Sequence, residues 1–550
     1  MPNLSQIKRQ RMLDFLETLK KEHTDDESIR AFTEIENQLR DKKYGLVWEE
    51  HSERVDEMLE ENIPIFTEDV DKKITASAEG VYNFILEGDN LQSLYLLEKT
   101  HSGCIDIIYI DPPYNTGSKD FKYNDAFVDK ADGFRHSKWL SFMYARLKIA
   151  RDLLSDTGLI FISIDDNEVA TLKLLCEEIF GENNFRGQIA RSTGTPTGQG
   201  NSILVNEIDY ILVFSKTDKA VFNGLPFDAD DAKIYNCEDE QGKYLVRPLR
   251  KTGGEDRRED RPSMYYGVTA PDGTEVFPIA PSGYESRWRC APSRYEELLS
   301  ENRIEWKHGK DGWKVYQKFY LEGRTKQPSN LWTKLEGNKK ATIVIKKLFG
   351  KNVFDFPKPV ELIKQIIMIS GSKSSVVLDF FAGSGTTGQA VAELNETDGG
   401  NRTFILCTNN ENNICEGVTY PRIKTVVTGI RIDGTKYSDG IPTNVKYFKC
   451  DWTPRKPEDY LLSNALCLHI REMIELQHGI EIDNVRNVLI LNKADFRKYV
   501  MDDAIYGQIE NIWVNQNIIF NSEEMERLNA LGFKYIPREF FGQELREAAE

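Results

Sequence analysis

Short apolar stretches that alternate with amphipathic stretches constrain this chain most. Ile105–Ile110 and Leu159–Ile164 are rich in β-branched residues and almost wholly apolar, which is typical of parallel strands buried on both faces. His136–Leu154 lies between them and has apolar residues at helical spacing, and Glu168–Phe180 repeats that spacing. The alternation predicts an α/β domain with a doubly wound, Rossmann-like, mostly parallel sheet.

A rigid turn follows the first of these strands. It consists of Asp111, Pro112, Pro113 and Tyr114. Two consecutive prolines neither continue a strand ladder nor enter a helix interior, so the chain must leave the sheet here. The turn holds a carboxylate and an aromatic ring at the carboxyl end of a strand, where open α/β sheets bind ligands. Taken alone, the tetrapeptide favours an ordinary turn with a solvated acid and a packing ring.

A second stretch changes this interpretation, because it has the form strand, glycine turn, helix. The apolar residues Val376–Phe381 run into a turn in which Gly383, Gly385 and Gly388 match G-x-G-x-x-G. Glycines let the backbone approach a ligand, and a helix N-terminus offers unpaired N–H groups. Glu411 follows the next strand, near where a ribose hydroxyl would need an acid. A NAD-dependent dehydrogenase is therefore one interpretation to weigh.

The segment 217–349 separates the two stretches and breaks the alternation. The whole chain has a net charge of −17, but residues 241–350 contain 22 Lys and Arg against 14 Asp and Glu. Arginines and aromatic residues interleave there, as in proteins that contact phosphates and base edges. The alternative is the solvated face of an ordinary β domain. The arginines that we expect to bind DNA are Arg247, Arg250, Arg257, Arg258, Arg261, Arg287 and Arg289.

Cysteine usage and hydropathy indicate the compartment. The eight cysteines are scattered and form no C-x-x-C pair, which argues against structural zinc and for reduced thiols. No metal site is expected. The chain has no run of about 18 apolar residues and opens with no signal peptide. We expect a cytoplasmic protein without a membrane partner.

The order of the two stretches around the insert resembles the beta class of S-adenosylmethionine-dependent DNA amino-methyltransferases. In that class the catalytic motif precedes the target-recognition domain and the cofactor motif follows it. Four further stretches resemble the modification subunits of Type III restriction systems: Gly88–Leu91, the predicted helix Trp139–Leu147, Ile164–Glu168 and Phe356–Pro359. Position 408 departs from the pattern, because it is Thr where members of the class often carry an acid for the ribose.

The resemblance implies a site-specific DNA methyltransferase that moves a methyl group from S-adenosylmethionine to adenine N6 in duplex DNA by base flipping. Asp111 and the carbonyl of Pro112 would accept the two amine hydrogens, and Tyr114 would stack on the base. Methylation at cytosine C5 would need a cysteine after a proline, and the sequence has no Pro-Cys. The residues expected around the cofactor are Asp89, Asn90, Phe356, Lys358, Asp379, Phe381, Gly383, Ser384, Gly385, Thr386, Asn409 and Glu411.

The resemblance also implies partners and a domain order. Double-stranded DNA, a second copy of the chain and a helicase-nuclease restriction subunit are the expected partners. Alternatives are a solitary DNA methyltransferase for adenine or cytosine N4, and a DNA-specificity subunit without catalysis. The expected segments are a helical extension (1–75), a catalytic half (76–216), a target-recognition domain (217–349), a cofactor half (350–435) and an α+β dimerisation or partner domain (436–550).

Overall fold

A ten-stranded sheet forms the centre of the larger of two compact units, residues 1–221 and 329–550. The computed structural model describes residues 4–23, 25–40, 48–118, 120–123, 126–194, 206–455 and 466–541. In spatial order the strands are β1 (Asn62–Glu68), β20 (Asn444–Pro454), β2 (Tyr82–Glu87), β19 (Thr403–Thr408), β18 (Val376–Asp379), β3 (Ile105–Ile110), β6 (Leu154–Ile164), β8 (Ile208–Ser215), β7 (Phe185–Ser192) and β17 (Leu331–Trp332).

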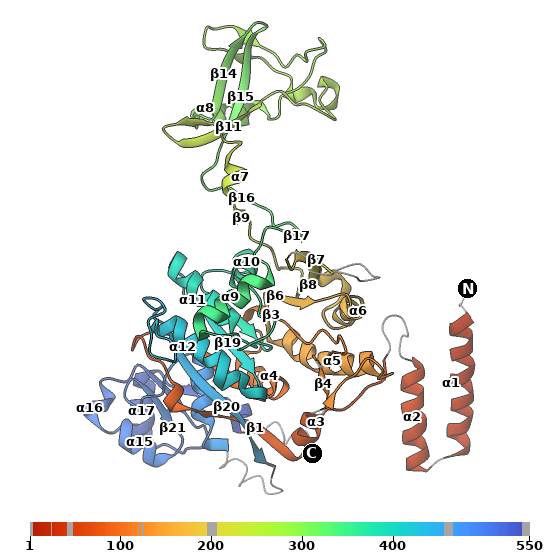
Figure 1. Cartoon of the computed structure of the whole chain (residues 1–550), viewed down its shortest axis with the longest axis vertical. Helices are drawn as coiled ribbons and strands as arrows, with labels where there is room; N and C mark the ends of the chain where they lie inside the picture. The colour runs from red at the N-terminus through yellow and green to blue at the C-terminus, as the bar shows by residue number, and fades with distance from the viewer. Residues whose placement is uncertain are drawn as a thin grey trace. The chain divides into compact units, whose positions relative to one another are not determined.

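The middle of the sheet is parallel and covered on both faces. Every neighbouring pair from β20 to β6 is parallel, whereas β1, β8 and β7 have antiparallel neighbours. Strands β3, β18 and β19 are almost wholly buried, as their apolar sequences require. Two groups of helices provide the cover (Figure 1): α4 (Asn90–His101), α5 (Arg135–Leu153) and α6 (Val169–Phe180), and α10 (Val360–Ser370), α11 (Thr386–Asp398) and α12 (Tyr420–Thr428). The predicted doubly wound, mostly parallel sheet is confirmed.

Strands β3 and β18 are neighbours although they lie on opposite sides of the insert in the sequence. Val377 pairs with Ile107 and Leu378 with Ile108, in parallel. Because carboxyl ends of parallel strands meet at one edge, the turn after β3 and the turn after β18 emerge side by side. The order β2–β19–β18–β3 places two strands of the second half between two strands of the first.

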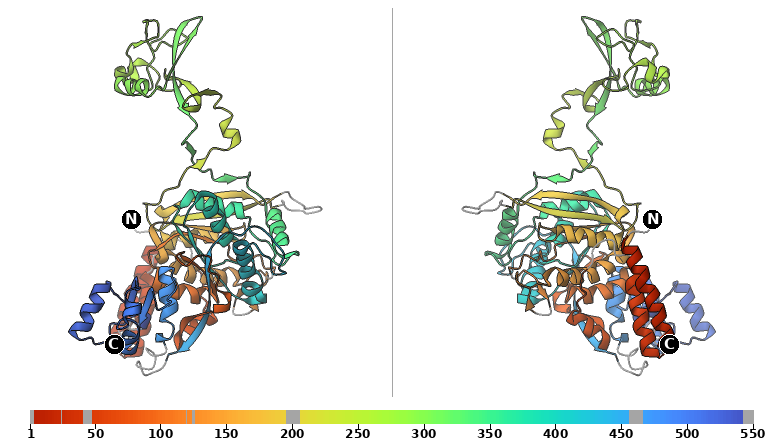
Figure 2. Two further views of the ribbon diagram at one scale, coloured as in Figure 1. Left: turned by 90° about the vertical axis from the view of Figure 1, so that its left-hand side faces the viewer. Right: turned by 90° about the vertical axis from the view of Figure 1, so that its right-hand side faces the viewer.

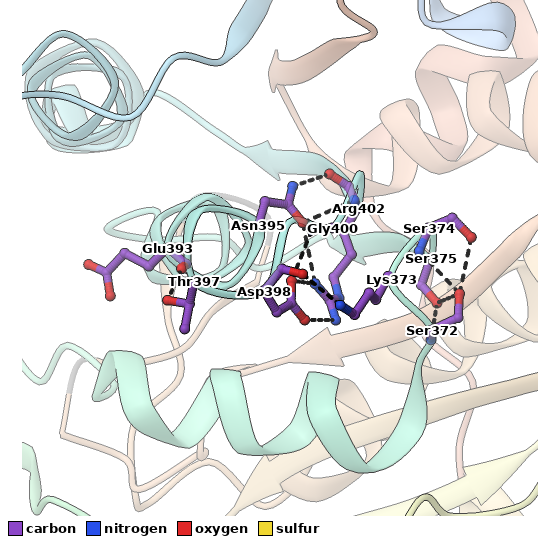
Figure 3. A network of polar contacts seen from close by, with 10 residues as sticks. All are labelled: Ser372, Lys373, Ser374, Ser375, Glu393, Asn395, Thr397, Asp398, Gly400 and Arg402. Carbon is purple, nitrogen blue, oxygen red and sulfur yellow. Dashed lines mark hydrogen bonds and ion pairs between the residues drawn. The ribbon is translucent and has the colours of Figure 1, made fainter.

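Polar contacts join the loops at the opposite edge of the sheet (Figure 3). The Arg402 guanidinium makes an ion pair with Asp398 at 2.8 Å, and Asn395 Nδ2 donates to the Arg402 carbonyl at 2.8 Å. Lys373 Nζ donates to the Asp398 carbonyl at 2.6 Å. The arginine holds the pKa of the Asp398 carboxyl below its usual range. These contacts tie the turn before β18 to the turn before β19.

The second compact unit is Phe222–Pro328 and has its own core. Leu249, Trp288, Leu298 and Val315 are buried together there. Its elements include β10 (Cys237–Asp239), β11 (Gly242–Pro248), β15 (Gly312–Tyr320) and β14 (Ile304–Gly309), which form one antiparallel sheet, and α8 (Pro292–Ser300).

This unit is shorter than the predicted insert. Residues 329–349 belong to the larger unit, where β17 joins the sheet beside β7. Helix α9 (Asn338–Phe349) follows, and its Leu348 packs with Ala392 and Val426 of the helices that cover the sheet. The basic, lysine-rich sequence of α9 resembles the insert, but its apolar face is buried on the cofactor half.

The terminal segments also differ from the predicted borders. Residues 1–75 contain helices α1 (Leu4–Glu22), α2 (Asp26–Arg40) and α3 (Arg54–Glu61), as expected, but also strand β1. Strand β20, placed in the C-terminal segment, pairs antiparallel with β1 and parallel with β2 (Figure 2). Borders at 75 and 435 would separate β1 and β20 from the sheet to which both strands belong, so these two expected borders are not domain borders. Strand β1 holds a proline, Pro64, so its sequence alone favours no strand.

A small α/β module occupies residues 487–535. Strands β21 (Asn487–Ile490), β22 (Asn511–Val514) and β23 (Lys534–Tyr535) form a parallel sheet. Buried residues of this sheet, among them Val488 and Ile512, pack with Phe496 and Leu528. The other elements of the C-terminal segment are α14 (Ile470–His478), α15 (Lys493–Tyr499), α16 (Asp503–Tyr506) and α17 (Ser522–Leu531).

In the ranges that the structure describes, no helix has both the length and the apolar composition that a membrane span requires.

Candidate active site

The turn Asp111–Tyr114 is fixed by a tryptophan that the chain buries completely. Trp139 of α5 donates its indole N–H to the carbonyl of Pro113 at 2.8 Å. The next residue, Asn115, is buried with φ 57°, a left-handed conformation that asparagine tolerates. Its Nδ2 donates to Glu168 Oε1 at 2.6 Å. The turn therefore has a defined shape, which argues against a solvated connection.

Lys358 reaches the same turn from the residues that precede α10. Its Nζ lies 2.8 Å from Asp111 Oδ1 and donates to the Tyr114 hydroxyl at 2.8 Å. The Lys358 side chain is only 8% exposed, and that of Asp111 is 26% exposed. Burial and the nearby Asp111 charge raise the pKa of the Tyr114 phenol well above its usual value. The phenol is therefore neutral at any physiological pH.

The glycine turn after β18 needs its glycines for backbone and for packing. Gly383 has φ 47° and Gly385 has φ 78°, in the left-handed region that side chains rarely adopt. A Cβ on Gly383 would lie 3.0 Å from the ring of Phe354, and one on Gly385 would lie 3.2 Å from Thr419 Cγ2. The close neighbours are protein atoms in both cases.

Asp379 closes this turn from the end of β18. Its Oδ1 accepts from the N–H of Phe381 at 3.1 Å, and its Oδ2 accepts from the Thr387 hydroxyl at 2.5 Å. Burial raises the pKa of the Asp379 carboxyl to about 7. The Asp379 side chain therefore lies inside the turn and connects the end of β18 to the start of α11.

Arg422 of α12 supports the turn from behind, a role that spacing alone does not reveal. Its Nη1 donates to the Ser384 hydroxyl and to the Thr386 hydroxyl, each at 2.8 Å, and its Nε donates to Gln389 Oε1 at 2.8 Å. The side chain is 1% exposed, and burial lowers the pKa of its guanidinium to about 10. Ser384 and Thr386, expected to bind the cofactor, are thus buried and bonded to this arginine.

A cavity of about 800 Å³ opens at the carboxyl edge of the sheet, a size typical of ligand sites. Its lining comes from segments that are far apart in the sequence: the loops after β2, β3, β18 and β19, and helix α3. Five of the expected cofactor residues line it, and Pro113 of the catalytic turn joins them. These five are Asp89, Asn90, Phe381, Asn409 and Glu411.

A buried arginine of α5 organises one wall of the cavity. Arg146 donates from Nε to Asn90 Oδ1 at 2.5 Å and from Nη1 to Glu53 Oε1 at 2.6 Å. Asn90 Nδ2 in turn donates to the Phe380 carbonyl at 3.0 Å. Burial raises the pKa of the Glu53 carboxyl. Sequence reasoning missed both Arg146 and Glu53, because an ion pair between residues 93 positions apart leaves no periodic signal.

Seven of the twelve expected cofactor residues do not line this cavity: Phe356, Lys358, Asp379, Gly383, Ser384, Gly385 and Thr386. The Phe356 side chain is 83% exposed and does not line the cavity, and its backbone has a φ of 54°. Lys358 does not line the cavity either, since its ammonium is bound by the catalytic turn. Thr408 does line it, together with Asn409, so the departure at this position lies inside the pocket.

The seven expected DNA-binding arginines divide by exposure within the second unit. Arg287 is buried, and its guanidinium donates to the carbonyl of Glu255 at 2.6 Å, so it cannot meet a phosphate. Arg250 is half-buried and donates to the Lys251 carbonyl. Arg258 is exposed but paired with Glu285 at 2.9 Å. The remaining four of the seven expected arginines are exposed: Arg247, Arg257, Arg261 and Arg289.

Comparison with known proteins adds independent evidence. Residues 105–419 match the family described as DNA methylase. The StyLTI Mod subunit, a Type III restriction-modification enzyme subunit from Salmonella typhimurium, is 39% identical over 64% of this chain and 56% of its own length. The EcoPI Mod subunit of the same enzyme type, from Escherichia phage P1, is 34% identical over 70% of this chain and 66% of its own length.

A Type II relative is covered more completely. The methyltransferase M.KpnI from Klebsiella pneumoniae is 37% identical over 66% of this chain and 89% of its own length. In contrast, the chain spans just over half of the StyLTI subunit. The matched family region contains both the turn at Asp111 and the glycine turn at Gly383. The chain belongs to the DNA methylase family.

Proposed function

We propose that this chain is a site-specific DNA methyltransferase that transfers a methyl group from S-adenosylmethionine to adenine N6 in duplex DNA. The observation that carries the proposal is the pairing of β3 with β18. It brings the Asp111 turn beside the glycine turn and opens a cavity between the loops that follow them. A dehydrogenase would have no use for the arginine- and aromatic-rich insert between the two turns.

The residues around the cavity fit an adenosine-containing cofactor. Phe381 offers an aromatic ring to a purine, and Glu411 and Asn409 offer oxygens to ribose hydroxyls. Asp89 accepts the N–H of Leu91 and caps α4, yet its side chain stays 44% exposed toward solvent and the cavity. When bound there, S-adenosylmethionine supplies the methyl group: the bond from sulfur to methyl breaks with its electrons left on sulfur, a bond to N6 forms, and the amine releases one proton.

The turn Asp111–Tyr114 would act on the target base and its amine. The adenine amine is a weak nucleophile, because its lone pair is delocalised into the ring. Asp111 is 26% exposed and pairs with Lys358 through Oδ1, so its Oδ2 can accept one N–H, while the Pro112 carbonyl accepts the other. Both contacts localise the lone pair on nitrogen, and such preorganised contacts speed a reaction without a covalent intermediate. Tyr114 would stack on the flipped base.

The second unit is proposed to be the target-recognition domain. Its support is the set of exposed arginines beside tyrosine rings: the Arg257 guanidinium lies 4.9 Å from the Tyr284 ring centroid, and that of Arg258 lies 4.4 Å from Tyr265. Such stacking holds a guanidinium plane in place for phosphate or base contact.

We further propose that the chain is the modification subunit of a Type III restriction-modification system, acting as a homodimer with a restriction subunit. The names of two relatives support this. A second candidate, a solitary methyltransferase, is favoured by M.KpnI, whose length the chain covers almost fully. Co-purification with a helicase-nuclease encoded beside it would favour the first, and full activity with no such neighbour the second.

One experiment tests the activity. The full chain is incubated with tritiated S-adenosylmethionine and genomic DNA from a host that lacks DNA methyltransferases. We expect label in DNA and, on long-read sequencing, N6-methyladenine within one recurring sequence. Label on cytosine N4 would contradict the adenine assignment, and unlabelled DNA would contradict the function as a whole.

A further inference from the structure

Within the described residues, the buried ammonium of Lys358 makes an ion pair with Asp111 and a hydrogen bond to Tyr114, both on the turn Asp111–Tyr114. Its Nζ is 2.8 Å from Asp111 Oδ1 and 2.8 Å from the Tyr114 hydroxyl, and lies 4.8 Å from the Tyr114 ring centroid. Burying a charge is costly unless it is paired and hydrogen-bonded, and here both conditions are met. If Lys358 only filled space, an apolar side chain of similar volume would do so without the free-energy cost of burying a charge.

The backbone around Lys358 is held on the opposite side of the site. Its carbonyl accepts a hydrogen bond from the Thr386 hydroxyl at 3.3 Å, at the start of the helix that follows the glycine turn. Pro357 and Pro359 flank it and restrict the backbone, and α10 begins directly afterwards. One residue therefore joins the cofactor loop through its main chain to the catalytic turn through its side chain.

We propose that Lys358 is a positioning residue for methyl transfer, which fixes the Asp111 carboxylate and the Tyr114 ring in the geometry that receives the target base. This inference rests on the proposed function. It differs from the cofactor contact that the family resemblance implies for Lys358. With Oδ1 held by the ammonium, Oδ2 of Asp111 is the oxygen left for the amine.

Other titratable groups lie around the Asp111–Lys358 pair, on strands β3, β18, β8 and β7 and after strand β6. Tyr109 on β3 and Asp379 on β18 act on Asp111, and Asp209 on β8 acts on both Asp111 and Lys358. Arg191 on β7 and Asp165 after β6 act on Asp209. The carboxylates outnumber the cations here, so the Lys358 charge offsets repulsion among them.

The test separates rate from cofactor affinity. Lys358→Met, Lys358→Arg and Lys358→Gln are compared with the parent in single-turnover methyl transfer to unmethylated genomic DNA, at saturating tritiated S-adenosylmethionine and across the acidic and basic limbs of the pH–rate profile. Lys364→Met is the matched control, because Lys364 is also ion-paired, with Glu361 and Glu393, and its side chain is 16% exposed. Titration calorimetry gives the cofactor dissociation constant.

We expect Lys358→Met to lower the single-turnover rate by about 10²-fold, the size of effect that a misplaced reacting group produces. The dissociation constant for S-adenosylmethionine stays at the parental value. The pH–rate profile differs from that of the parent, because the charge paired with the Asp111 carboxylate is gone. Lys358→Arg recovers part of the rate, since it restores the charge, and Lys364→Met behaves as the parent.

Three results would overturn the inference. Parental rate and profile in Lys358→Met would make the lysine a packing residue. Weakened cofactor binding with a parental rate at saturation would make it a cofactor residue. A parent that labels no DNA would remove the proposed function and this inference together, whereas the first two results leave the function standing. Lys358→Gln is one atom shorter but keeps an uncharged hydrogen-bond donor, so a folding defect of the methionine variant does not end the test.

Discussion

At the scale of single residues, Asp111 has two roles that one substitution can separate. It would accept the amine of the base through one oxygen, and it pairs with the buried Lys358 through the other. Replacing it by alanine removes both. Replacing it by asparagine keeps a neutral oxygen and the side-chain volume but removes the charge that compensates the lysine.

We predict that Asp111→Ala abolishes methyl transfer while S-adenosylmethionine and duplex binding persist. Removing one preorganised hydrogen bond to the reacting group costs on the order of 3 kcal/mol or more. The variant should also melt at lower temperature, because it leaves the Lys358 charge unpaired. Single-turnover rates and thermal melts check this. A parental rate in Asp111→Ala would place the chemistry elsewhere.

Tyr114 tests capture of the base. Tyr114→Ala should weaken binding of duplex substrate by about 1–3 kcal/mol if the ring stacks on the flipped base. Tyr114→Phe should recover the affinity but not the hydrogen bond from Lys358. Binding isotherms with methylatable DNA measure this, and equally weakened binding in both variants would mean that the hydroxyl, not the ring, matters.

Asp379 gives a prediction about pH and stability. Its pKa is about 7 in the folded chain, against an ordinary value of 3.8. Between these values the folded state holds a proton that the unfolded state has released, so stability falls as pH rises from about 4 to 7 and is level above. Asp379→Asn should flatten this decline, since it is neutral throughout. Urea unfolding within and above this pH window checks it, and an unchanged slope would contradict the buried-carboxyl account.

At the scale of elements, the glycine turn is more than a ligand contact. Gly385→Val should abolish cofactor binding and also lower stability, because the left-handed φ and the Thr419 methyl group both oppose a side chain. Gly399→Val is the control, since Gly399 has φ 65° at the end of the same helix with no atom within 4 Å of a Cβ. Calorimetry and melting curves separate strain, which both variants share, from crowding at the cofactor turn.

How far the sequence predicts these elements depends on where their partners lie. The strands at Ile105 and Val376 are predictable because a strand that is buried on both faces requires a continuous run of apolar residues. Strand β1 is not, since its partner β20 lies almost 400 residues away. The buried arginines Arg146 and Arg422 escape prediction for the same reason. Lys358 is recognisable in the sequence, but only the fold shows which half of the site holds its ammonium.

At the scale of the whole molecule, binding to DNA should depend on exposed arginines of the second unit. Replacing Arg257, Arg258 and Arg261 by alanine should weaken binding and lower the slope of log K against log salt by about 1 for each phosphate that is no longer neutralised. Arg294→Ala, on α8 of the same unit and paired with Glu297, is the matched control. Salt titrations on the full chain measure this, and an unchanged slope in the triple variant would place DNA on another surface.

The pairing of β3 with β18 has a consequence for biosynthesis. Residues 107 and 377 pair side by side, so a ribosome must add roughly 270 residues after β3 before its partner exists. At about 5–20 residues per second, this takes on the order of 15–60 s. During that interval one edge of β3 has no neighbour and the cofactor turn has not been made. A nascent chain would therefore lack the proposed methyl-transfer site throughout this interval, and its half-built sheet is the species on which chaperones would act.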